Sequence, residues 1–353
     1  MFHIPAPGAT QRDSVRSPTF DMTTAGLVVL IVVALGFDFT NGFHDAANAV
    51  ATAIGSRALR PLTALVMAAV LNAVGALVST RVAATIAGGI IEIPGGHSGL
   101  VIIFAALVGA IAWNLVTWHL GLPSSSTHAL IGGLVGAALA SAGRVHWHTL
   151  YDKAIVPMLL SPVIGVALGF VAMAVILRVF ALARPEAVNR GFRMAQGLST
   201  AAMAYSHGTQ DAQKTMGVIT LALLATGHLA HFEVPVWVIL AAAVAMGLGT
   251  LAGGWRIIGT LGSRITPLDP PRGFAAQSAA SAVLLVSAYA YAMPVSSTHV
   301  LTSTVVGVGT TRRFSAVRWG VARRVAVAWL LTLPGAAVTA LVAYEIVRAV
   351  VGA

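Results

Sequence analysis

The sequence predicts an all-α integral membrane protein with about ten transmembrane segments. Of its 353 residues, 57% are hydrophobic and only 9% are charged, and the mean hydropathy is +0.86. A soluble domain carries roughly 25% charged residues to cover its surface. Several segments hold about 20 apolar residues, the length of a membrane-spanning helix. This favours helices over a β-barrel, whose strands alternate with a period of two.

The predicted segments follow the chain in two matching series of five. Each series opens with a segment that a polar motif interrupts, and basic or Gly-rich stretches such as 81–98 separate the later ones. The first series covers 24–56, 62–79, 99–118, 129–142 and 154–180. The second covers 194–226, 234–253, 274–292, 300–310 and 326–350.

Charge and cysteine content narrow the function classes. The net charge of +10 comes almost wholly from arginines between the segments, which we interpret as membrane-orienting charges and not as a nucleic-acid surface. The absence of cysteine excludes disulfides, thiolate metal sites and a thiol nucleophile. Residues 1–21 hold prolines and scattered charges without an apolar core, so we expect a flexible tail there and not a signal peptide.

Two polar motifs interrupt the apolar segments at matching places. The first is Asn41-Gly42-Phe43-His44-Asp45-Ala46-Ala47-Asn48, and the second is His207-Gly208-Thr209-Gln210-Asp211-Ala212-Gln213-Lys214. A carboxylate inside a membrane segment is costly and marks a functional site. The glycines and polar residues predict discontinuous or re-entrant helices, which are tolerated at membrane depth where they are buried in protein or line a watery cavity.

A second pair of motifs is rich in hydroxyl groups. Pro123-Ser124-Ser125-Ser126-Thr127-His128 returns as Pro294-Val295-Ser296-Ser297-Thr298-His299, at an offset of 171 residues (299 − 128). The two aspartate motifs are offset by 166 residues (211 − 45). Because two unrelated motifs recur in the same order at nearly the same offset, the sequence indicates an internal duplication.

Loop charge predicts that the second repeat is inverted in the membrane. Residues 57–61 carry two arginines where the matching 227–235 carry only Glu233, whereas 312–324 hold five arginines where 143–153 hold one excess positive charge. Basic loops tend to be cytoplasmic, so the two halves face opposite ways. The predicted parts are a tail (1–21), a first repeat (22–182), a cytoplasmic central loop (183–193) and a second repeat (194–353).

The hydroxyl motifs predict a site for a tetrahedral oxyanion. A proline ends one helix, and the residues after it can begin another, whose first N–H groups and positive dipole end are free. Such helix ends bind phosphate-like anions. The alternative is that these hydroxyls only cap helices. The candidate ligands are Ser125, Ser126, Thr127, Ser296, Ser297 and Thr298.

The carboxylates of Asp45 and Asp211 would repel an anion on their own. Each can coordinate Na⁺ with backbone carbonyls and neutral side chains, or take a proton and donate a hydrogen bond to the anion. We expect a coupling-cation site at Asp45, Asn41 and Asp211, with Asn48 as a further neutral ligand. A structural ion pair or a solvated helix end is the alternative.

Lys214 stands where the first half has Asn48, and it lies three residues from Asp211, on the same helical face. We hypothesise that it neutralises Asp211 or binds the anion in place of a second cation. The alternative is a lysine that reaches to the membrane interface. Asp38 and Glu345 have no counterpart in the other half, so a structural or interfacial role is expected for both.

His128 and His299 end the hydroxyl motifs. They could relay protons or hydrogen-bond a helix start, and we favour the structural role because the chain has no metal-ligand spacing.

These four motifs resemble the duplicated signatures of the inorganic phosphate transporter (Pit) family over nearly the whole chain after the tail. The resemblance implies a cation-coupled phosphate symporter with inverted repeats in the cell membrane, as a homodimer. It also implies metal–phosphate complexes as a possible cargo, and sulfate in one branch. His44 and Gln210 stand where the family commonly has Asn, and the Asp-Ala-Gln-Lys form resembles the bacterial branch, in which proton coupling is known.

The sequence therefore predicts a transporter, not an enzyme, that imports inorganic phosphate by alternating access with H⁺ or Na⁺ and without a cofactor. Three alternatives are a sulfate transporter of the same fold, an intramembrane Ser/His hydrolase and a channel. A hydrolase needs one nucleophile and has no reason to duplicate every part. The predicted phosphate ligands are Asp45, Asn48, Ser125, Ser126, Thr127, Asp211, Lys214, Ser296, Ser297 and Thr298.

Overall fold

The structure is a computed structural model that describes residues 22–87 and 89–351. In this part of the chain the regular elements are all helices, beside one isolated β-bridge between Ile91 and Val145. The first half contains α1 (Met22–Gly55), α2 (Pro61–Ala76), α3 (Arg81–Ala87), α4 (His97–His119), α5 (Ser126–Ala140), α6 (Trp147–Leu150), η1 (Tyr151–Ile155) and α7 (Val156–Val179). The second contains α8 (Pro185–Ala225), α9 (Val236–Ala252), α10 (Trp255–Gly259), η2 (Thr260–Arg264), α11 (Pro270–Tyr289), α12 (Ser297–Thr310), η3 (Phe314–Ala316) and α13 (Trp319–Val351).

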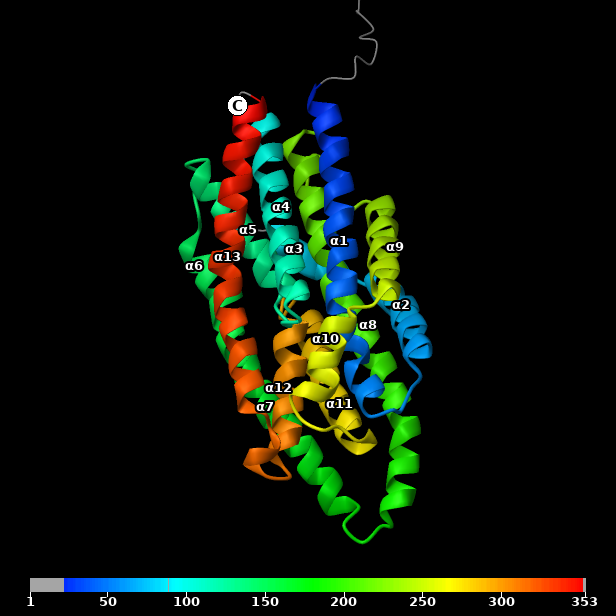
Figure 1. Cartoon of the computed structure of the whole chain (residues 1–353). Coiled ribbons are helices and arrows are strands. Elements are labelled where there is room, and N and C mark those ends of the chain that lie inside the picture. Colours follow the sequence, from blue (N-terminus) through cyan, green and yellow to red (C-terminus); the bar gives the residue numbers. More distant parts are fainter. Residues whose placement is uncertain (1–21, 88, 352–353) are drawn as a thin grey trace, which may run out of the picture.

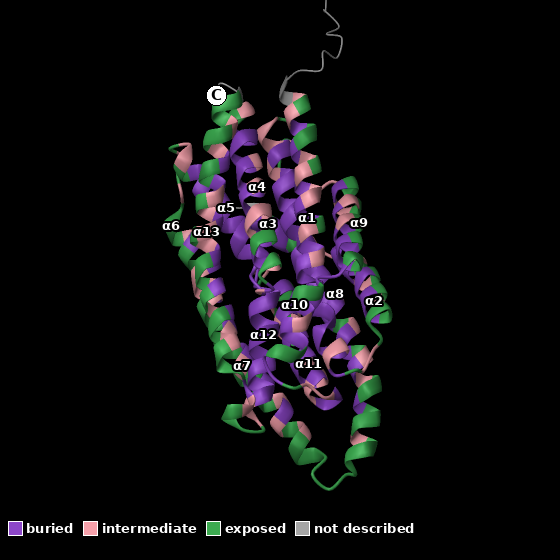
Figure 2. Cartoon of the chain, viewed as in Figure 1, coloured by how far each residue is buried: buried purple, intermediate pink, exposed green. Residues whose placement is uncertain are grey.

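The helices form an elongated bundle. The start of α1 and the end of α13 lie at one end, and the turn between α7 and α8 lies at the other (Figure 1). Buried residues concentrate on the inner faces of α1, α4, α5, α8 and α12, while α7 and α13 keep exposed outer faces (Figure 2). The predicted tail, 1–21, lies outside the described residues.

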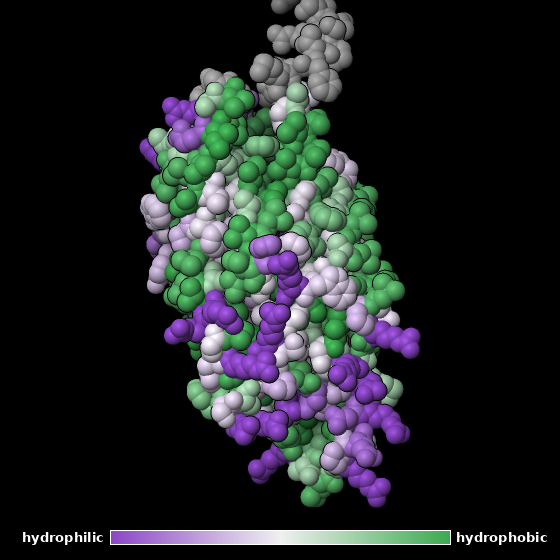
Figure 3. Space-filling model, in the orientation of Figure 1, coloured by the Kyte–Doolittle hydropathy of each residue, from purple (hydrophilic) through white to green (hydrophobic). Residues whose placement is uncertain are grey.

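The outside of the bundle is apolar. Leu62, Val163 and Val338 are among many large hydrophobic side chains that stay exposed. Hydrophobic residues cover the upper part of the face in Figure 3, and hydrophilic ones gather toward the end that holds the α7–α8 turn. Soluble monomers rarely expose apolar surface on this scale, so the outer faces fit a hydrocarbon environment.

Four helical stretches are long and apolar enough to cross a membrane: 24–55, 97–119, 147–179 and 319–350. A fifth arises if α9 and the 255–264 segment, which meet at a 59° bend, form one broken span. Helices α2 and α5 are apolar but shorter, and the length of α8 is interrupted by its polar motif. The membrane character is therefore clear, while the predicted number of ten spans stays a prediction.

The helix breaks occur at only one of the two kinds of motif. The chain leaves helical conformation between α4 and α5 and between α11 and α12, at the hydroxyl motifs, as predicted. The breaks predicted at the aspartate motifs are absent, because α1 and α8 run through them as continuous helices. Gly42 and Gly208 do not unwind these helices. They allow close helix contacts instead.

The segment predicted as a central loop, 183–193, is mostly helical. Helix α8 begins at Pro185, a residue whose fixed φ suits the first helical turn and whose missing N–H costs nothing there. Glu186 adds a negative charge in the same turn, where the helix dipole favours it. Only a short turn, 180–184, separates α7 from α8.

The two halves pack against each other reciprocally. Gly42 of α1 packs on α9, and Gly208, its counterpart in α8, packs on α2. In the same way Gly136 of α5 meets Ala337 of α13, and Gly307 of α12 meets Val166 of α7. Gly136 and Gly307 are 171 residues apart (307 − 136), and so are Val166 and Ala337 (337 − 166). Each half therefore completes the helix packing of the other.

Replacing Gly208 with Ala is expected to destabilise this packing by about 1–3 kcal/mol, the usual range for overpacking. A Cβ at Gly208 would overlap the Asn72 carbonyl oxygen, and that backbone atom cannot move aside alone. Gly191→Ala in the same helix is the control, since a Cβ there would meet no atom of the described chain within 4 Å and Ala favours helix. Thermal unfolding of the purified protein in detergent checks both. Equal unfolding temperatures would contradict the packing argument.

Candidate functional site

Polar side chains from four helices meet inside the bundle. Helices α1 and α8 contribute the aspartate motifs, and the first residues of α5 and α12 contribute the hydroxyl motifs. We call this cluster the polar core and define it by Asp45, Asn48, Ser126, His207, Asp211, Lys214, Ser297 and Thr298. Every member is buried. The structure therefore brings the predicted motifs of both halves into one site.

The starts of α5 and α12 show why the hydroxyl motifs form helix ends. The residues before them are extended at Ser125 and Ser296, and each of these hydroxyls accepts a hydrogen bond from the backbone N–H three residues later, at His128 (3.3 Å) and His299 (3.2 Å). Ser125 and Ser296 thus act as N-caps, which was the alternative considered for the motif. The next hydroxyls, of Ser126 and Ser297, open the helices and face the core.

Asp45 lies at the centre of the polar core. Its Oδ2 accepts a hydrogen bond from the Ser126 hydroxyl (2.9 Å), and its Oδ1 accepts a longer one from Thr298 (3.5 Å). Its Oδ1 also lies 2.7 Å from His44 Nδ1. The one carboxylate thus connects the N-terminus of α5 in the first half with the N-terminus of α12 in the second.

Asn48 extends this connection. Its amide nitrogen donates to the hydroxyls of Ser297 (3.2 Å) and Thr298 (2.9 Å). Asn48 lies one helical turn after Asp45 on α1, so both side chains point at α12 from the same helix face. Thr127 is buried in the first turn of α5, next to Ser126.

Lys214 is buried and does not reach to the interface, so that alternative is wrong. Its ammonium group lies 3.0 Å from Asp211 Oδ2 and donates to Ser126 Oγ at 2.7 Å. The predicted proximity of Lys214 and Asp211 on one helix face is confirmed. Since Ser126 also contacts Asp45, one hydroxyl bridges the charged groups of both halves.

His207 lies between the two carboxylates. Its Nε2 is 3.0 Å from Asp211 Oδ2 and 4.0 Å from Asp45 Oδ2. One ligand atom from each of Asp45, His207 and Asp211 lies within 4.8 Å of the others, a spacing that could hold a cation. On its other side His207 Nδ1 contacts Asn72 Oδ1 (3.3 Å), which orients the ring.

Some predicted site residues lie elsewhere. Asn41 is buried on α1 but has no hydrogen bond to the polar core among the described residues. Asp38 is buried too, so an interfacial role for it is wrong, whereas Glu345 is half-exposed and pairs with Arg348 at 3.5 Å. His128 and His299 stack at 5.0 Å between ring centroids, which fits the structural role favoured for them.

Sequence reasoning missed the support behind His44. Its Nε2 lies 3.2 Å from Thr117 Oγ1 and 3.3 Å from Ser124 Oγ, and these two hydroxyls are 2.7 Å apart. Thr117 is a lone polar residue in an apolar helix, and its hydroxyl can bond to a local backbone carbonyl. No signal in the sequence therefore marked it as a partner of His44.

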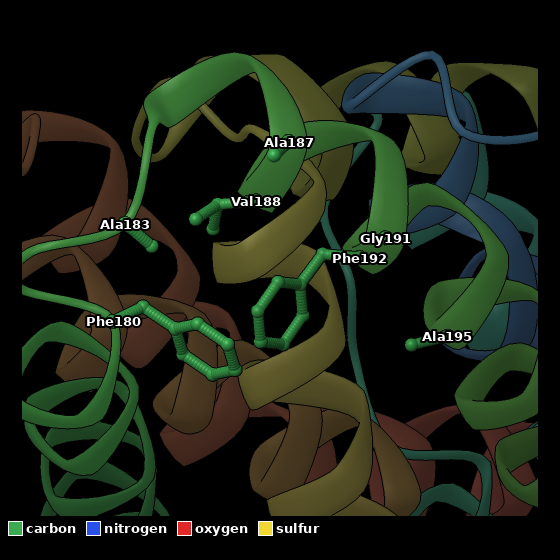
Figure 4. A pocket seen from close by; sticks show the side chains of 7 residues that line it. All are labelled: Phe180, Ala183, Ala187, Val188, Gly191, Phe192 and Ala195. Atoms are coloured by element: carbon green, nitrogen blue, oxygen red, sulfur yellow. The ribbon is translucent and has the colours of Figure 1, made fainter.

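An apolar groove lies at the α7–α8 turn, away from these residues. The side chains of Phe180, Val188 and Phe192 line it, and the two phenylalanine rings meet edge to face at 5.3 Å (Figure 4). It offers an anion no polar side chain among those that line it. The polar core remains the candidate site.

A buried ion-binding core inside an apolar helical bundle defines a membrane transport protein. The comparison with known families specifies which one. The chain belongs to the phosphate transporter family, whose model matches residues 41–340. The prediction of a transporter and not an enzyme is thereby confirmed.

Similar proteins support the assignment along almost the whole chain. A probable low-affinity inorganic phosphate transporter of Bacillus subtilis is 43% identical over 323 residues, covering 91% of this chain and 97% of that protein. One of Rhizobium meliloti is 47% identical over 322 residues, covering 90% and 95%. A solved structure described as "The sodium-dependent phosphate transporter" has a TM-score of 0.82 at 24% identity, covering 92% of this chain and 99% of that one, and shows the fold.

Family membership also decides between two interpretations of one contact chain. Ser124, His44 and Asp45 touch in the order of a hydrolytic triad. However, Asp45 is also bonded to Ser126 and Thr298, and the Ser124 hydroxyl is fully buried against Thr117. We therefore assign these contacts to the positioning of Asp45.

Proposed function

We propose that this protein is a secondary active symporter that imports inorganic phosphate by alternating access. The observation that carries the proposal is the meeting of two hydroxyl-bearing helix N-termini, one from each half, at Asp45 and Lys214. Hydroxyl donors, free helix N–H groups and a buried ammonium suit a tetrahedral oxyanion. The proposed ligands are Ser126, Thr127, Ser297, Thr298, Asn48 and Lys214.

Charge explains why a cation must accompany the anion. Asp45 and Asp211 bring two negative charges to the polar core, against one fixed positive charge on Lys214. Phosphate adds further negative charge in a buried site, where unbalanced charge is costly. We propose that Asp45 and Asp211, with Asn41 one turn before Asp45, hold the coupling H⁺ or Na⁺ so that phosphate and cation bind together.

The architecture of the proposal is a pair of inverted repeats. The reciprocal packing of Gly42 with Gly208 and of Gly136 with Gly307 supports a two-fold relation between the halves. The arginine-rich loops and the α7–α8 turn would face the cytoplasm, as basic segments usually do. Insertion in the cell membrane and a homodimer follow from the resemblance and stay predictions.

Sulfate is the closest alternative substrate. Phosphate at neutral pH carries a proton that it can donate to a carboxylate, whereas sulfate carries none. Asp45 beside the hydroxyls of Ser126 and Thr298 therefore favours phosphate over sulfate.

Uptake of labelled phosphate into proteoliposomes tests the proposal. Imposed Na⁺ or H⁺ gradients are expected to drive accumulation, with excess sulfate competing weakly, and addition of Mg²⁺ tests a metal–phosphate cargo. The gradient that drives uptake identifies the coupling ion. Uptake that only equilibrates under both gradients would indicate a channel, and its absence would remove phosphate as the substrate.

Ser126→Ala is expected to raise the KM for phosphate about tenfold or more. The substitution removes the hydrogen bonds to Asp45 and Lys214, each worth roughly 1 kcal/mol or more, and 1.4 kcal/mol is tenfold in binding. Ser263→Ala is the control, because that exposed hydroxyl bonds only a local carbonyl. An unchanged KM in a folded Ser126→Ala variant would remove Ser126 from the site.

A further inference from the structure

A second group of unpaired polar side chains lies on α1, before the polar core. Asp38, Asn41, Asp45 and Asn48 follow the spacing of one helix face, and only the last two belong to the core. Asp38 is fully buried, and neither of its carboxylate oxygens has a hydrogen-bond partner within the described chain. The same holds for both amide atoms of Asn41.

The packing of α1 on α4 places a third residue in this group. The helices run in parallel, since Gly26 lies against Leu100 and His44 contacts Thr117. These pairs are offset by 74 (100 − 26) and 73 (117 − 44) residues. The same offset places Asn114 opposite Asn41. Asn114 is buried, and its amide atoms are also unpaired within the residues described.

The packing of α1 on α8 adds a fourth residue. These helices run antiparallel, with His207 near Asp45 at one level and the Thr215 hydroxyl facing the Asp38 carboxyl at another. The Thr215 hydroxyl is buried and likewise has no formed hydrogen bond within 22–87 and 89–351. Three helices therefore direct unpaired oxygen atoms into one region, about 10 Å along α1 from Asp45 at 1.5 Å per residue.

Leaving these groups unpaired would be costly. Each buried polar group without a partner costs roughly 1–3 kcal/mol, and an isolated buried carboxylate costs more. Native proteins pair such groups with protein, water or an ion. The available side-chain oxygens come from one carboxylate, two amides and one hydroxyl, which are hard ligands typical of alkali and alkaline-earth cations.

The charge of this group selects a monovalent cation. One carboxylate and neutral oxygens balance a single positive charge, whereas a divalent ion would leave an excess positive charge inside the bundle. In addition, the buried acids Asp38, Asp45 and Asp211 outnumber Lys214, the buried lysine among the described residues. A monovalent cation beside Asp38 would reduce this excess of negative charge.

We propose that Asp38, Asn41, Asn114 and Thr215 form a binding site for Na⁺, separate from the phosphate ligands. The site lies between α1, α4 and α8 on the side of the polar core toward the start of α1. Asn41 stands between this site and Asp45, so an ion here would lie one helical turn or two from the transported anion. The site binds Na⁺ whether or not phosphate is present.

Equilibrium binding of ²²Na⁺ to the purified protein without phosphate tests the site. Saturable binding is expected in the unmodified protein, and Asp38→Asn and Asn114→Leu are expected to weaken it at least about tenfold, the usual effect of altering an ion site. Glu345→Gln, which removes a half-exposed acid from α13, and Asp45→Asn are expected to retain it. No saturable binding in the unmodified protein, or equal affinity in Asp38→Asn, would overturn the proposal.

Thermal unfolding gives a second readout that does not depend on radiolabel. Na⁺ is expected to raise the unfolding temperature of the unmodified protein, as any ligand of the folded state does, and choline is not. This Na⁺-dependent rise should be lost in Asp38→Asn and kept in Glu345→Gln; a rise that persists in Asp38→Asn contradicts the site. Failure of the proposed transport function would appear separately, as absent phosphate uptake by the unmodified protein.

Discussion

Asp45→Asn is expected to reduce gradient-driven phosphate uptake at least about 100-fold. Asn has nearly the shape of Asp and keeps an acceptor for the Ser126 hydroxyl, but it has no negative charge with which to hold a cation or a proton. A 100-fold loss corresponds to about 2.7 kcal/mol, which a lost charge–charge contact in a buried site readily supplies. Initial rates of labelled phosphate uptake into proteoliposomes measure the effect.

Asp152→Asn is the matched control for this prediction. Asp152 is half-exposed and pairs with His148 at 3.0 Å, far along the chain from either motif. The control should transport at the unmodified rate. If Asp45→Asn also transports at that rate while remaining folded, the polar core does not couple cation and anion.

Lys214→Asn is expected to change both affinity and stoichiometry. The substitution places Asn where the first half has Asn48 and removes the ammonium group from Asp211 and Ser126. Without this fixed charge, one more cation should be needed to balance each phosphate. We expect the KM for phosphate to rise about tenfold or more, in line with the loss of a charge-assisted hydrogen bond.

The charge moved per phosphate tests this directly. It is obtained from the membrane potential at which net uptake into proteoliposomes reverses, and it should increase by one elementary charge in Lys214→Asn. Lys153→Asn is the control, since Lys153 is the other lysine of the chain and lies outside both motifs. A Lys214→Asn variant that keeps its KM and its stoichiometry would exclude a role for Lys214 as a substitute cation.

The sequence was most informative where local chemistry determines local structure. The prolines before Ser124 and Val295 predicted helix starts at the hydroxyl motifs, and α5 and α12 begin there. The three-residue spacing of Asp211 and Lys214 predicted their contact. The duplication predicted that the two halves would share one site, and the polar core contains residues of both.

The failures came from features that depend on which helices become neighbours. Gly42 and Gly208 suggested breaks, yet they allow close packing within continuous helices. Lone polar residues in apolar segments, such as Asn114 and Thr117, gave no signal because each could have bonded its own backbone. Their roles became visible only when α4 was placed parallel to α1.

The most direct test of the account is the position of bound phosphate. A cryo-electron-microscopy structure of the protein saturated with phosphate is expected to show one anion within roughly 3.2 Å, hydrogen-bond distance, of hydroxyls from both halves. Ser126 or Thr127 should contact it from α5, and Ser297 or Thr298 from α12, with Lys214 alongside. Density that touches one half only, or that lies outside the polar core, would contradict a single phosphate site shared by the two halves.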